Sequence, residues 1–233
     1  MCTRFLLLEK HYHALLQRLG VVQPATWNSR YNIAPTSLIP AVRVTSDEDA
    51  ATVDLIRWGL VPSWAKSADT PPLVNARAES VAEKPSFRDA LRHRRCVIPA
   101  SGYYEWQTVG RTKKPWLIQR KNEEAFGFAA VWETWYGADQ PLVTCAIITT
   151  SPSEATSSIH PRMPVMLTPE QCTEWLSPRS NPAAPPALLG PAPAETLSLT
   201  AISRRINSSR HDSADCLAPA AADEEGPQLS FDL

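Results

Sequence analysis

Several features that would place this protein in a specialised class are missing from its sequence. No apolar run approaches the roughly 18 residues that a membrane-spanning helix requires. The first ten residues contain only three consecutive leucines before the chain turns polar. That start is too short for a secretory signal and lacks a small-residue cleavage site. We therefore expect a soluble cytoplasmic protein that does not associate with membranes.

Cysteine is scarce and irregularly spaced. The cysteines are odd in number and include no C-x-x-C pair, which argues against a disulfide framework and against a zinc site; they are Cys2, Cys96, Cys145, Cys172 and Cys216. All except Cys2 lie in apolar or helical contexts that are typical of small buried side chains. We predict no metal site and no cofactor.

An excess of charge of one sign is also absent. The net charge is −1, so a nucleic-acid-binding function would have to rest on a local patch. With 233 residues, 43% of them hydrophobic and 20% charged, the chain can bury one sizeable core. We expect a monomer with one domain over residues 1–217, a Pro/Ala-rich insertion at 178–194, and a flexible tail over 218–233.

Short runs of β-branched and aromatic residues, bounded by turn residues, predict strands. They lie at 53–58, 96–99, 103–106, 116–119, 126–132, 142–149, 165–167 and 197–202, and Gly110 links two of them as a hairpin. Residues 30–35 are predicted to be a loop with an extended segment before Pro35. Because strands outnumber helices and mostly follow one another directly, we predict an α+β fold. It is a single domain built on mostly antiparallel, barrel-like β-sheet with a few short flanking helices.

Three segments predict helices. Apolar residues recur at helical spacing from Leu8 to Leu19, and Gly20 marks the end. Ser86 is the expected N-cap of a second short helix, with Asp89 at the third position. The third begins at Thr168–Pro169–Glu170–Gln171 and runs to about Leu176, because this tetrapeptide combines a capping threonine, a first-turn proline and a glutamine at the third position.

Cys2 directly follows the initiator methionine. Methionine aminopeptidases generally remove Met before a small residue such as cysteine, so we expect the mature chain to begin with a free 1,2-aminothiol. An α-amine titrates near 7.7–8.0 and a thiol near 8.5, so both are partly nucleophilic at neutral pH. The amine can condense with an aldehyde, and the thiol can then close a thiazolidine ring on the same carbon. Position alone, however, favours a coincidental cysteine over a reactive one.

Six short segments occur in order along the chain, and together they resemble the SRAP family (SOS response-associated peptidase), whose members crosslink to abasic sites. The segments are Met1–Phe5, Arg30–Pro35, Trp58–Pro62, Asn75–Glu79, Gly102–Trp106 and Ile159–Pro164. The resemblance runs from Met1 to about Cys216, interrupted by the Pro/Ala-rich stretch. One departure is Thr3, where the family usually has glycine; a side chain there could crowd the approach to the lesion and slow the reaction.

The resemblance implies a catalytic set of Cys2, Asn75, Glu105 and His160. An abasic sugar is mostly a closed hemiacetal, so an acid–base group must open the ring, and His160 suits this role. Glu105, flanked by aromatic residues, would shuttle a proton to and from the amine if its pKa were raised. Asn75 would hold the sugar or phosphate by neutral hydrogen bonds. Taken singly, each has an ordinary structural interpretation: a loop histidine, a solvent-facing strand glutamate and a turn asparagine.

DNA contacts are predicted beside the catalytic positions. Arginine suits phosphate because its fork donates two parallel bonds, and aromatic rings can stack on bases. The implied contacts are Arg4, Asn32, Trp64, Arg77, Phe87, Trp106 and Arg162. Some of the eight tryptophans must instead be structural. The run Arg92–Arg95 and the pair Lys113–Lys114 either extend a basic track or form a solvated face. Because the aldehyde must be unstacked, single-stranded DNA is the expected substrate.

The last six residues resemble the motif by which bacterial proteins dock on the replication sliding clamp. An extended peptide would place Gln228, Leu229, Phe231 and Leu233 in a hydrophobic groove, which implies a protein that works at the nucleoid of a bacterial cell. The predicted function is that of a sensor and shield of abasic sites in the DNA damage response. Two alternatives stay open: a thiol peptidase using Cys2 and His160, whose simplest form is self-removal of Met1, and a non-catalytic binder of single-stranded DNA.

Overall fold

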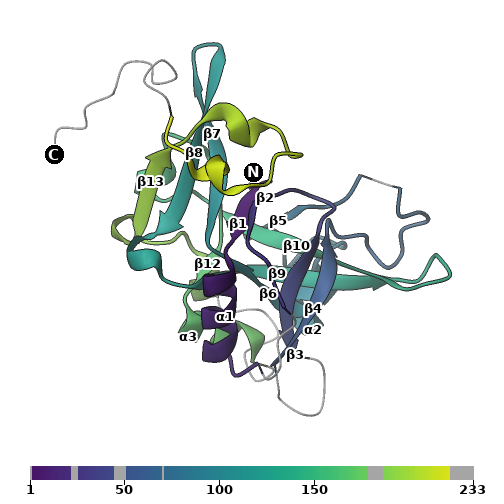
Figure 1. Cartoon of the computed structure of the whole chain (residues 1–233). Helices are drawn as coiled ribbons and strands as arrows, with labels where there is room; N and C mark the ends of the chain where they lie inside the picture. Colours follow the sequence, from purple (N-terminus) through teal and green to yellow (C-terminus); the bar gives the residue numbers. More distant parts are fainter. Residues whose placement is uncertain (1, 22–25, 45–50, 70, 178–185, 221–233) are drawn as a thin grey trace.

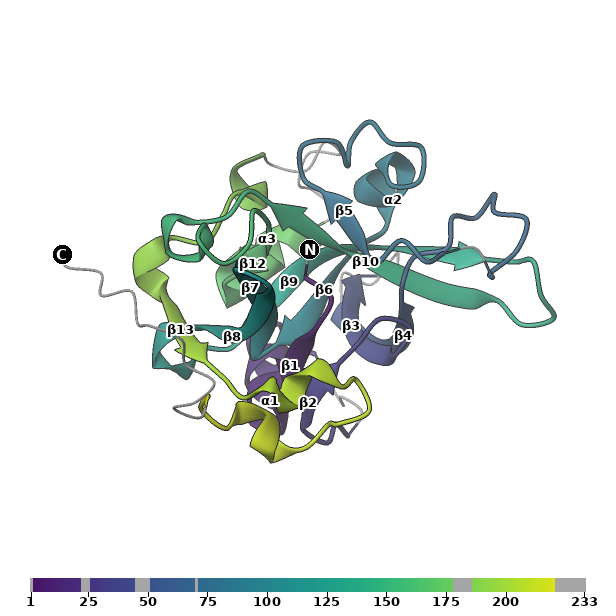
Figure 2. The same cartoon turned by 90° about the horizontal axis from the view of Figure 1, so that it is seen from above.

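Two β-sheets form the body of the protein in this computed structural model (Figures 1 and 2). The structure describes residues 2–21, 26–44, 51–69, 71–177 and 186–220. The first sheet has the strand order β13–β8–β7–β1–β2. Its strands are β13 (Leu197–Ala201), β8 (Thr112–Arg120), β7 (Gly102–Val109), β1 (Phe5–Leu7) and β2 (Arg30–Ile33).

The second sheet has the order β11–β10–β4–β3–β6–β9–β12, and β5 pairs with β10. Its strands are β3 (Leu38–Val44), β4 (Ala51–Trp58), β5 (Asn75–Arg77), β6 (Arg95–Ala100), β9 (Phe126–Trp135), β10 (Leu142–Thr150), β11 (Met163–Pro164) and β12 (Met166–Leu167). Since β10 also pairs with β9, the strands β10, β4, β3, β6 and β9 form a closed ring. Between the described strands, all pairings are antiparallel except those of β10 with β4 and β5. The predicted α+β, mostly antiparallel and barrel-like fold is confirmed.

Among the described residues, three short α-helices flank the sheets: α1 (Glu9–Arg18), α2 (Arg88–His93) and α3 (Pro169–Leu176). Both α1 and α3 pack against β6 and β9 (Figure 1). The predicted cap of α3 is confirmed, since Gln171 N donates to Thr168 Oγ1 at 3.3 Å and Thr168 N donates to Gln171 Oε1 at 2.9 Å. This capping box satisfies two N–H groups that would otherwise lack helical partners.

The predicted cap of α2 is wrong. The helix begins at Arg88, and its N-cap is Phe87, which makes no side-chain capping hydrogen bond. A preceding turn replaces the cap, because the carbonyl of Lys84 accepts hydrogen bonds from the N–H groups of both Phe87 and Arg88 at 2.9 Å. The ring of Phe87 meanwhile enters the apolar core.

Five of the described strands were not expected from the sequence. The predicted loop at 30–35 contains β2, which pairs with β1 through Ile33 opposite Phe5. Besides these two strands, β3, β5 and β11 were also missed. Pro40 argues against an internal strand, but β6 pairs only with Val42 and Arg43 of β3, so Pro40 lies where β3 has no partner on that side. The hairpin at Gly110 is confirmed, with φ +59° at the turn.

A large core lies between the sheets and helices. Phe5 packs edge-on against Trp58 and Phe128, with ring centroids 5.3 and 5.7 Å apart. This arrangement suits the quadrupoles of aromatic rings. A second, smaller apolar cluster lies under the C-terminal segment and contains Leu6, Tyr104, Leu117, Ile202, Ile206 and Cys216. Strand β1 contributes to both clusters, so the residues just after Cys2 are held rigidly.

The segment from 202 to 220 crosses the first sheet near the N-terminus, and we call it the strap (yellow in Figures 1 and 2). It contains two 3-10 turns, η5 (Arg204–Asn207) and η6 (Ala214–Leu217), which contact β8 and β2 respectively. Part of the predicted insertion, Pro186–Leu189, is also a 3-10 turn (η3), and Leu188 is buried. Within the described residues, no helix is long and apolar enough to cross a membrane.

Candidate active site

Cys2 lies in the main apolar core, three residues before the start of β1. Strand β1 lies between β2 and β7 in the first sheet, and no part of Cys2 is exposed. Its Sγ donates to the carbonyl of Arg4 at 3.8 Å. Burial, followed by the nearby Glu105 carboxylate, raises the pKa of the Cys2 thiol far above its ordinary value. The sulfur is therefore held as a neutral thiol.

Asn75 fixes the backbone of Cys2. It lies on β5, which pairs in parallel with β10 opposite Ile147, and its Nδ2 donates to the carbonyl of Cys2 at 2.9 Å. The other amide atom, Oδ1, is buried and accepts no hydrogen bond from the part of the chain that the structure describes. An amide oxygen left open in this way can accept a hydrogen bond from a sugar hydroxyl.

Glu105 and His160 form an acid–base pair beside Cys2. Glu105 lies on β7 and is only 5% exposed. Burial raises the pKa of its carboxyl to about 7. His160 precedes β11, and its Nδ1 lies 3.8 Å from Glu105 Oε1. Burial lowers the pKa of His160, so His160 favours its neutral form near pH 7, while the Glu105 carboxyl exchanges between its neutral and ionised forms there.

The backbone of Arg162 orients the His160 ring. The amide nitrogen and the carbonyl oxygen of Arg162 both lie 3.1 Å from His160 Nδ1. An amide N–H can only donate, so the neutral ring accepts this bond when its proton is on Nε2. The ring edge that carries Nε2 can then act on a bound substrate.

Tyr103 belongs to the site although the sequence did not single it out. It lies two residues before Glu105 on β7, so both side chains point to the same face of the strand. Burial, followed by the charges of Cys2 and Glu105, raises the pKa of its hydroxyl well above the ordinary value. The alternation within Gly102–Trp106 was the signal that could have found it.

Arg4 and Trp106 both contact the strap. Arg4 Nη1 donates to Asn32 Oδ1 at 2.7 Å and to the Ile206 carbonyl at 3.0 Å. Trp106 Nε1 donates to Asn207 Oδ1 at 2.7 Å. The guanidinium carbon of Arg4 lies 6.0 Å from the centre of the Trp106 ring.

Two of the residues predicted to contact DNA, Asn32 and Phe87, are buried in this structure. Asn32 is fully buried. Its Nδ2 donates to three strap carbonyls, those of Ile206, Ser208 and His211, at 2.8–3.2 Å. Phe87 is 5% exposed and lies in the main core. Asn32 thus positions Arg4 and the strap, and Phe87 is a packing residue.

Arg162 is held by protein groups. Its guanidinium forms a bidentate pair with Glu79, at 2.6 and 3.0 Å, and donates to the Thr149 carbonyl at 2.6 Å. The hydrogen bonds from Arg162 hold the pKa of Glu79 below its usual range. This pair ties the loop of His160 to β10 and to the turn after β5. Glu79 is a second residue that the sequence interpretation overlooked.

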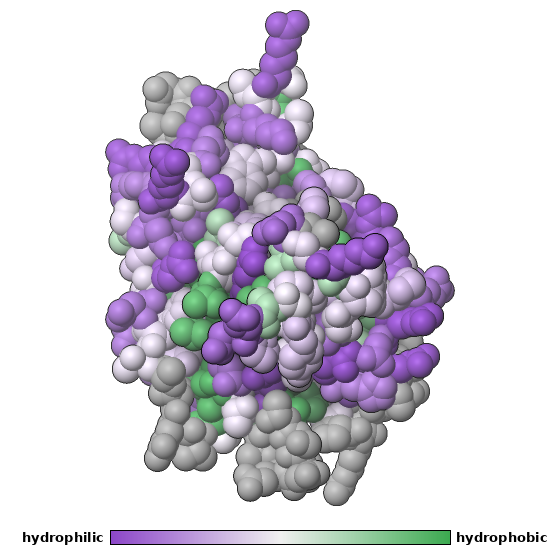
Figure 3. Space-filling model, turned by 90° about the vertical axis from the view of Figure 1, so that its right-hand side faces the viewer, coloured by the Kyte–Doolittle hydropathy of each residue, from purple (hydrophilic) through white to green (hydrophobic). Residues whose placement is uncertain are grey.

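The remaining predicted contacts lie at the surface. Trp64 is 67% exposed, Arg77 is exposed on β5 two residues after Asn75, and Trp106 is partly exposed. The face shown in Figure 3 is mostly hydrophilic with limited apolar patches. Half of the basic run at 92–95 is structural, because Arg94 pairs with Glu133 and Arg95 donates to the Ser177 carbonyl.

Thr3 does not strain the backbone. The described residues other than glycine that have a positive φ are Thr36 and Glu123. The backbone at Thr3 therefore has no need of glycine, and any effect of this residue on the reaction would come from its side chain.

The residues Gln228, Leu229, Phe231 and Leu233 lie outside the described residues. The proposed clamp-docking peptide therefore stays a prediction. The same holds for the boundaries of the tail and for the N-terminal half of the Pro/Ala-rich stretch.

Comparison with known proteins matches residues 1–209 to the family described as SOS response associated peptidase (SRAP). The chain is 37% identical to the abasic site processing protein YoqW of Bacillus subtilis, over 93% of this chain and 99% of that protein. It is 33% identical to the mouse abasic site processing protein HMCES, covering 84% of this chain and 67% of that protein. A crystal structure of a Bacteroides thetaiotaomicron protein superposes with a TM-score of 0.83 at 26% identity, covering 94% of this chain and 100% of the other. The chain belongs to the SRAP family.

Proposed function

We propose that this protein processes abasic sites by forming a covalent crosslink through Cys2. The observation that carries the proposal is the meeting of Cys2 with three groups from distant parts of the chain. Asn75 holds the Cys2 carbonyl at 2.9 Å, while Glu105, whose pKa is raised to about 7 by burial, lies 3.8 Å from His160. The relatives' names, which describe abasic site processing, support the same conclusion.

The reaction requires that Met1 be removed. The freed amine of Cys2 attacks the C1′ aldehyde of the ring-opened sugar, and loss of one water gives an imine. The Cys2 sulfur then adds to the imine carbon while the thiol proton passes to the nitrogen, closing a thiazolidine ring. No electron is gained or lost. Because the nitrogen no longer carries a double bond to carbon, the ring cannot promote the β-elimination that an imine permits.

The neighbouring groups supply the proton transfers. His160 opens the hemiacetal, since burial lowers the pKa of its ring and a neutral imidazole can exchange a proton with the sugar oxygens. Glu105 accepts the ammonium proton of Cys2, and its protonated form returns a proton to the departing water. Asn75 Oδ1, which is buried and open within the described chain, accepts a hydrogen bond from the sugar.

Single-stranded DNA is the proposed substrate, because the aldehyde must leave the base stack to reach a buried sulfur. Arg77 and Arg4 would contact phosphates, and Trp64 and Trp106 would stack on flanking bases. Trp64 is readily accessible, with 67% of its surface exposed.

A crosslinking assay tests the proposal. The protein is incubated with a single-stranded oligonucleotide carrying one abasic site, and the adduct is followed on a denaturing gel. We expect a stable adduct with the natural chain, a weaker one with Cys2→Ser, and none with Cys2→Ala. Peptide cleavage without an adduct would instead identify a thiol peptidase, and salt-sensitive binding alone a DNA-binding module.

A variant that retains Met1 tests the ring closure itself. A peptide bond to Met1 acylates the Cys2 nitrogen, so an N-terminal fusion that blocks removal should abolish thiazolidine formation. Intact mass spectrometry confirms whether Met1 is present in each preparation. An undiminished adduct from the blocked protein would refute the aminothiol mechanism.

A further inference from the structure

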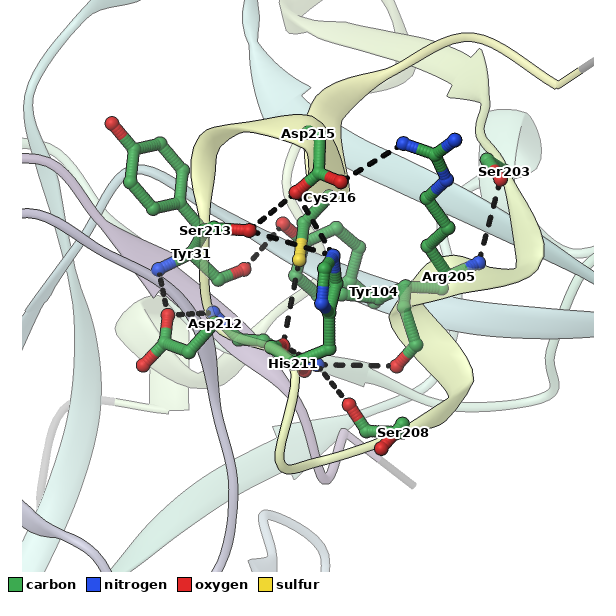
Figure 4. A network of polar contacts seen from close by, with 12 residues as sticks. Tyr31, Tyr104, Ser203, Arg205, Ser208, His211, Asp212, Ser213, Asp215 and Cys216 are labelled. Carbon is green, nitrogen blue, oxygen red and sulfur yellow. Dashed lines mark hydrogen bonds and ion pairs between the residues drawn. The ribbon is translucent and has the colours of Figure 1, made fainter.

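Three metal-binding side chains converge in the strap, far along the chain from the catalytic residues. They are His211, Asp215 and Cys216, and their ligand atoms all lie within 4.8 Å of one another. Figure 4 shows the imidazole, the carboxylate and the sulfur directed toward one point above Tyr104. We propose that these three side chains form a zinc-binding site that locks the strap in place.

The types of ligand suit zinc. A thiolate, an imidazole and a carboxylate are the donors that zinc takes in proteins, at about 2.0–2.3 Å from the metal. Two ligands of a tetrahedral zinc at those distances are about 3.5 Å apart. The present separations, up to 4.8 Å, therefore need to shrink by about 1 Å. His211 lies in the loop before η6 and Asp215 lies within η6. Rotation of the two partly exposed side chains can supply this movement.

The hydrogen bonds now present show what the metal would replace. His211 Nε2 lies 2.9 Å from Asp215 Oδ1, and zinc would take the place of the proton between them. Arg205 Nη1 donates to the other carboxylate oxygen of Asp215, Oδ2, at 2.9 Å. This hydrogen bond can remain when zinc binds to Oδ1, and it would then orient the Asp215 carboxylate from outside the site. The Cys216 thiol, which now donates to the His211 carbonyl at 3.5 Å, would lose its proton to solvent on binding.

The surroundings leave one coordination position for water. Cys216 is fully buried in the second apolar cluster, so the sulfur approaches from the inner side. The side chains of His211 and Asp215 are 37% and 39% exposed, so the outer side is open to solvent. Three protein ligands and a water complete a tetrahedron.

The site is supported by a rigid frame. Asp212 accepts hydrogen bonds from the backbone N–H groups of Tyr31 and Asn32 and pairs with Arg30 Nε at 2.8 Å. Asn32 Nδ2 donates to the carbonyl of His211 itself at 2.8 Å, and the same asparagine holds Arg4. Zinc would therefore stabilise the segment that positions Arg4, without contacting the crosslinking residues.

Metal titration of the full-length protein tests the proposal. All measurements use a Cys2→Ser background, because the N-terminal aminothiol is itself a chelator. We expect one Zn²⁺ per chain in competition with a chromophoric chelator, and a rise in Tm with Zn²⁺. Co²⁺ should give a thiolate charge-transfer band and the visible spectrum of a tetrahedral site.

Two ligand variants and one matched control decide the result. Cys216→Ser should remove the charge-transfer band, and both Cys216→Ser and His211→Gln should raise the Kd for Zn²⁺ at least about tenfold. His93→Gln is the control, since His93 also pairs with an aspartate four residues away but has no cysteine beside it; its Kd should not change. If Cys216→Ser fails to fold, the partly exposed His211→Gln still decides. Absence of saturable binding, or an affinity that both ligand variants leave unchanged, would overturn the proposal.

Discussion

At the scale of single residues, burial decides the chemistry of Glu105. A glutamate on a strand ordinarily has a pKa near 4.3, whereas the apolar surroundings raise that of Glu105 to about 7. The group can therefore exchange protons at the pH of the cell. The same burial makes its charged form unfavourable in the folded protein, so catalysis and stability oppose each other at this position.

Glu105→Gln tests both effects. We expect the crosslinking rate of the natural protein to rise with an ionisation near pH 7 as the carboxylate forms. In the variant the rate should fall, and the midpoint of its pH dependence should move toward the amine pKa of 7.7–8.0. Single-turnover rates between pH 5.5 and 9 measure this. Glu124→Gln, a change at an exposed glutamate, should leave the profile unchanged; a profile that Glu105→Gln does not shift would contradict the assigned role.

The stability of the same variant should respond to pH in a defined direction. The folded-state pKa of Glu105 is raised, so between about 4.3 and 7 the folded protein binds more protons than the unfolded chain, and stability falls as the pH rises. Glu105→Gln removes this loss. Its gain in the free energy of unfolding should be absent near pH 4 and reach at most about 4 kcal/mol at pH 8. Denaturant unfolding at both pH values measures it, and an equal change at both would count against a buried titrating carboxyl.

Variants of Arg77 and Arg162 distinguish an arginine that contacts DNA from one that supports the fold. Arg77 is exposed on β5, so Arg77→Ala should weaken DNA binding and reduce the slope of log K against log salt by about 1, with little change in Tm. Arg162 is bonded to Glu79 and Thr149, so Arg162→Ala should lower the free energy of unfolding by about 1–3 kcal/mol. Fluorescence anisotropy and thermal melts distinguish the two. An Arg162→Ala protein of normal stability with a reduced salt slope would show that Arg162 contacts DNA directly.

At the scale of elements, the strap is held by side chains rather than by strand pairing along its length. Asp212 joins it to β2 and Asn32 joins it to Arg4. Burial alone would raise the pKa of Asp212, but hydrogen bonds from Arg30, Tyr31 and Asn32 hold it below the usual value. The ionised form thus stabilises the fold above the unfolded-state pKa, and this contribution is lost as the pH falls through the lowered value.

Asp212→Asn should loosen the strap without touching the reacting groups. The amide group of the new asparagine turns an N–H donor toward Arg30. We therefore expect the free energy of unfolding to fall by about 1–3 kcal/mol at neutral pH, and by less in acid. The DNA concentration for half-maximal crosslinking should rise several-fold, while the rate at saturating DNA stays near that of the natural protein. Asp54→Asn breaks a pair with Arg43 on β3 and β4 and is the matched control. A fall in the saturated rate alone would contradict a positioning role for the strap.

At the scale of the whole molecule, the two ends of the chain have separate proposed tasks. Cys2 lies in the core beside β1, whereas the clamp-docking hexapeptide follows a short acidic, proline-containing stretch. Deleting Gln228–Leu233 should leave crosslinking in vitro intact and weaken binding to the bacterial sliding clamp. Surface plasmon resonance on immobilised clamp measures this, with an internal shuffle of the six residues as the control. Unchanged clamp affinity after deletion would discard the docking peptide.

Much of the architecture was predictable because local patterns carried it. The strands from β6 to β10 have β-branched and aromatic runs between turns, and α3 begins with a complete capping signal at Thr168–Gln171. By contrast, β1 and β5 are three residues long. A strand that short is defined by its partners, so its own residues give no reliable signal.

The sequence by itself determined the family, the general fold and the identity of the four catalytic candidates, because these depend on ordered motifs and on hydrophobic patterning. Only the tertiary structure decided which of the residues predicted to contact DNA are exposed and which are buried or bonded within the protein. Exposure and hydrogen bonding depend on segments distant in the chain: Asn32 is enclosed by the strap some 174 residues later, and Arg162 is paired with Glu79 across 83 residues. The raised pKa of Glu105 has the same origin, since desolvation is a property of the packed surroundings and not of the residue.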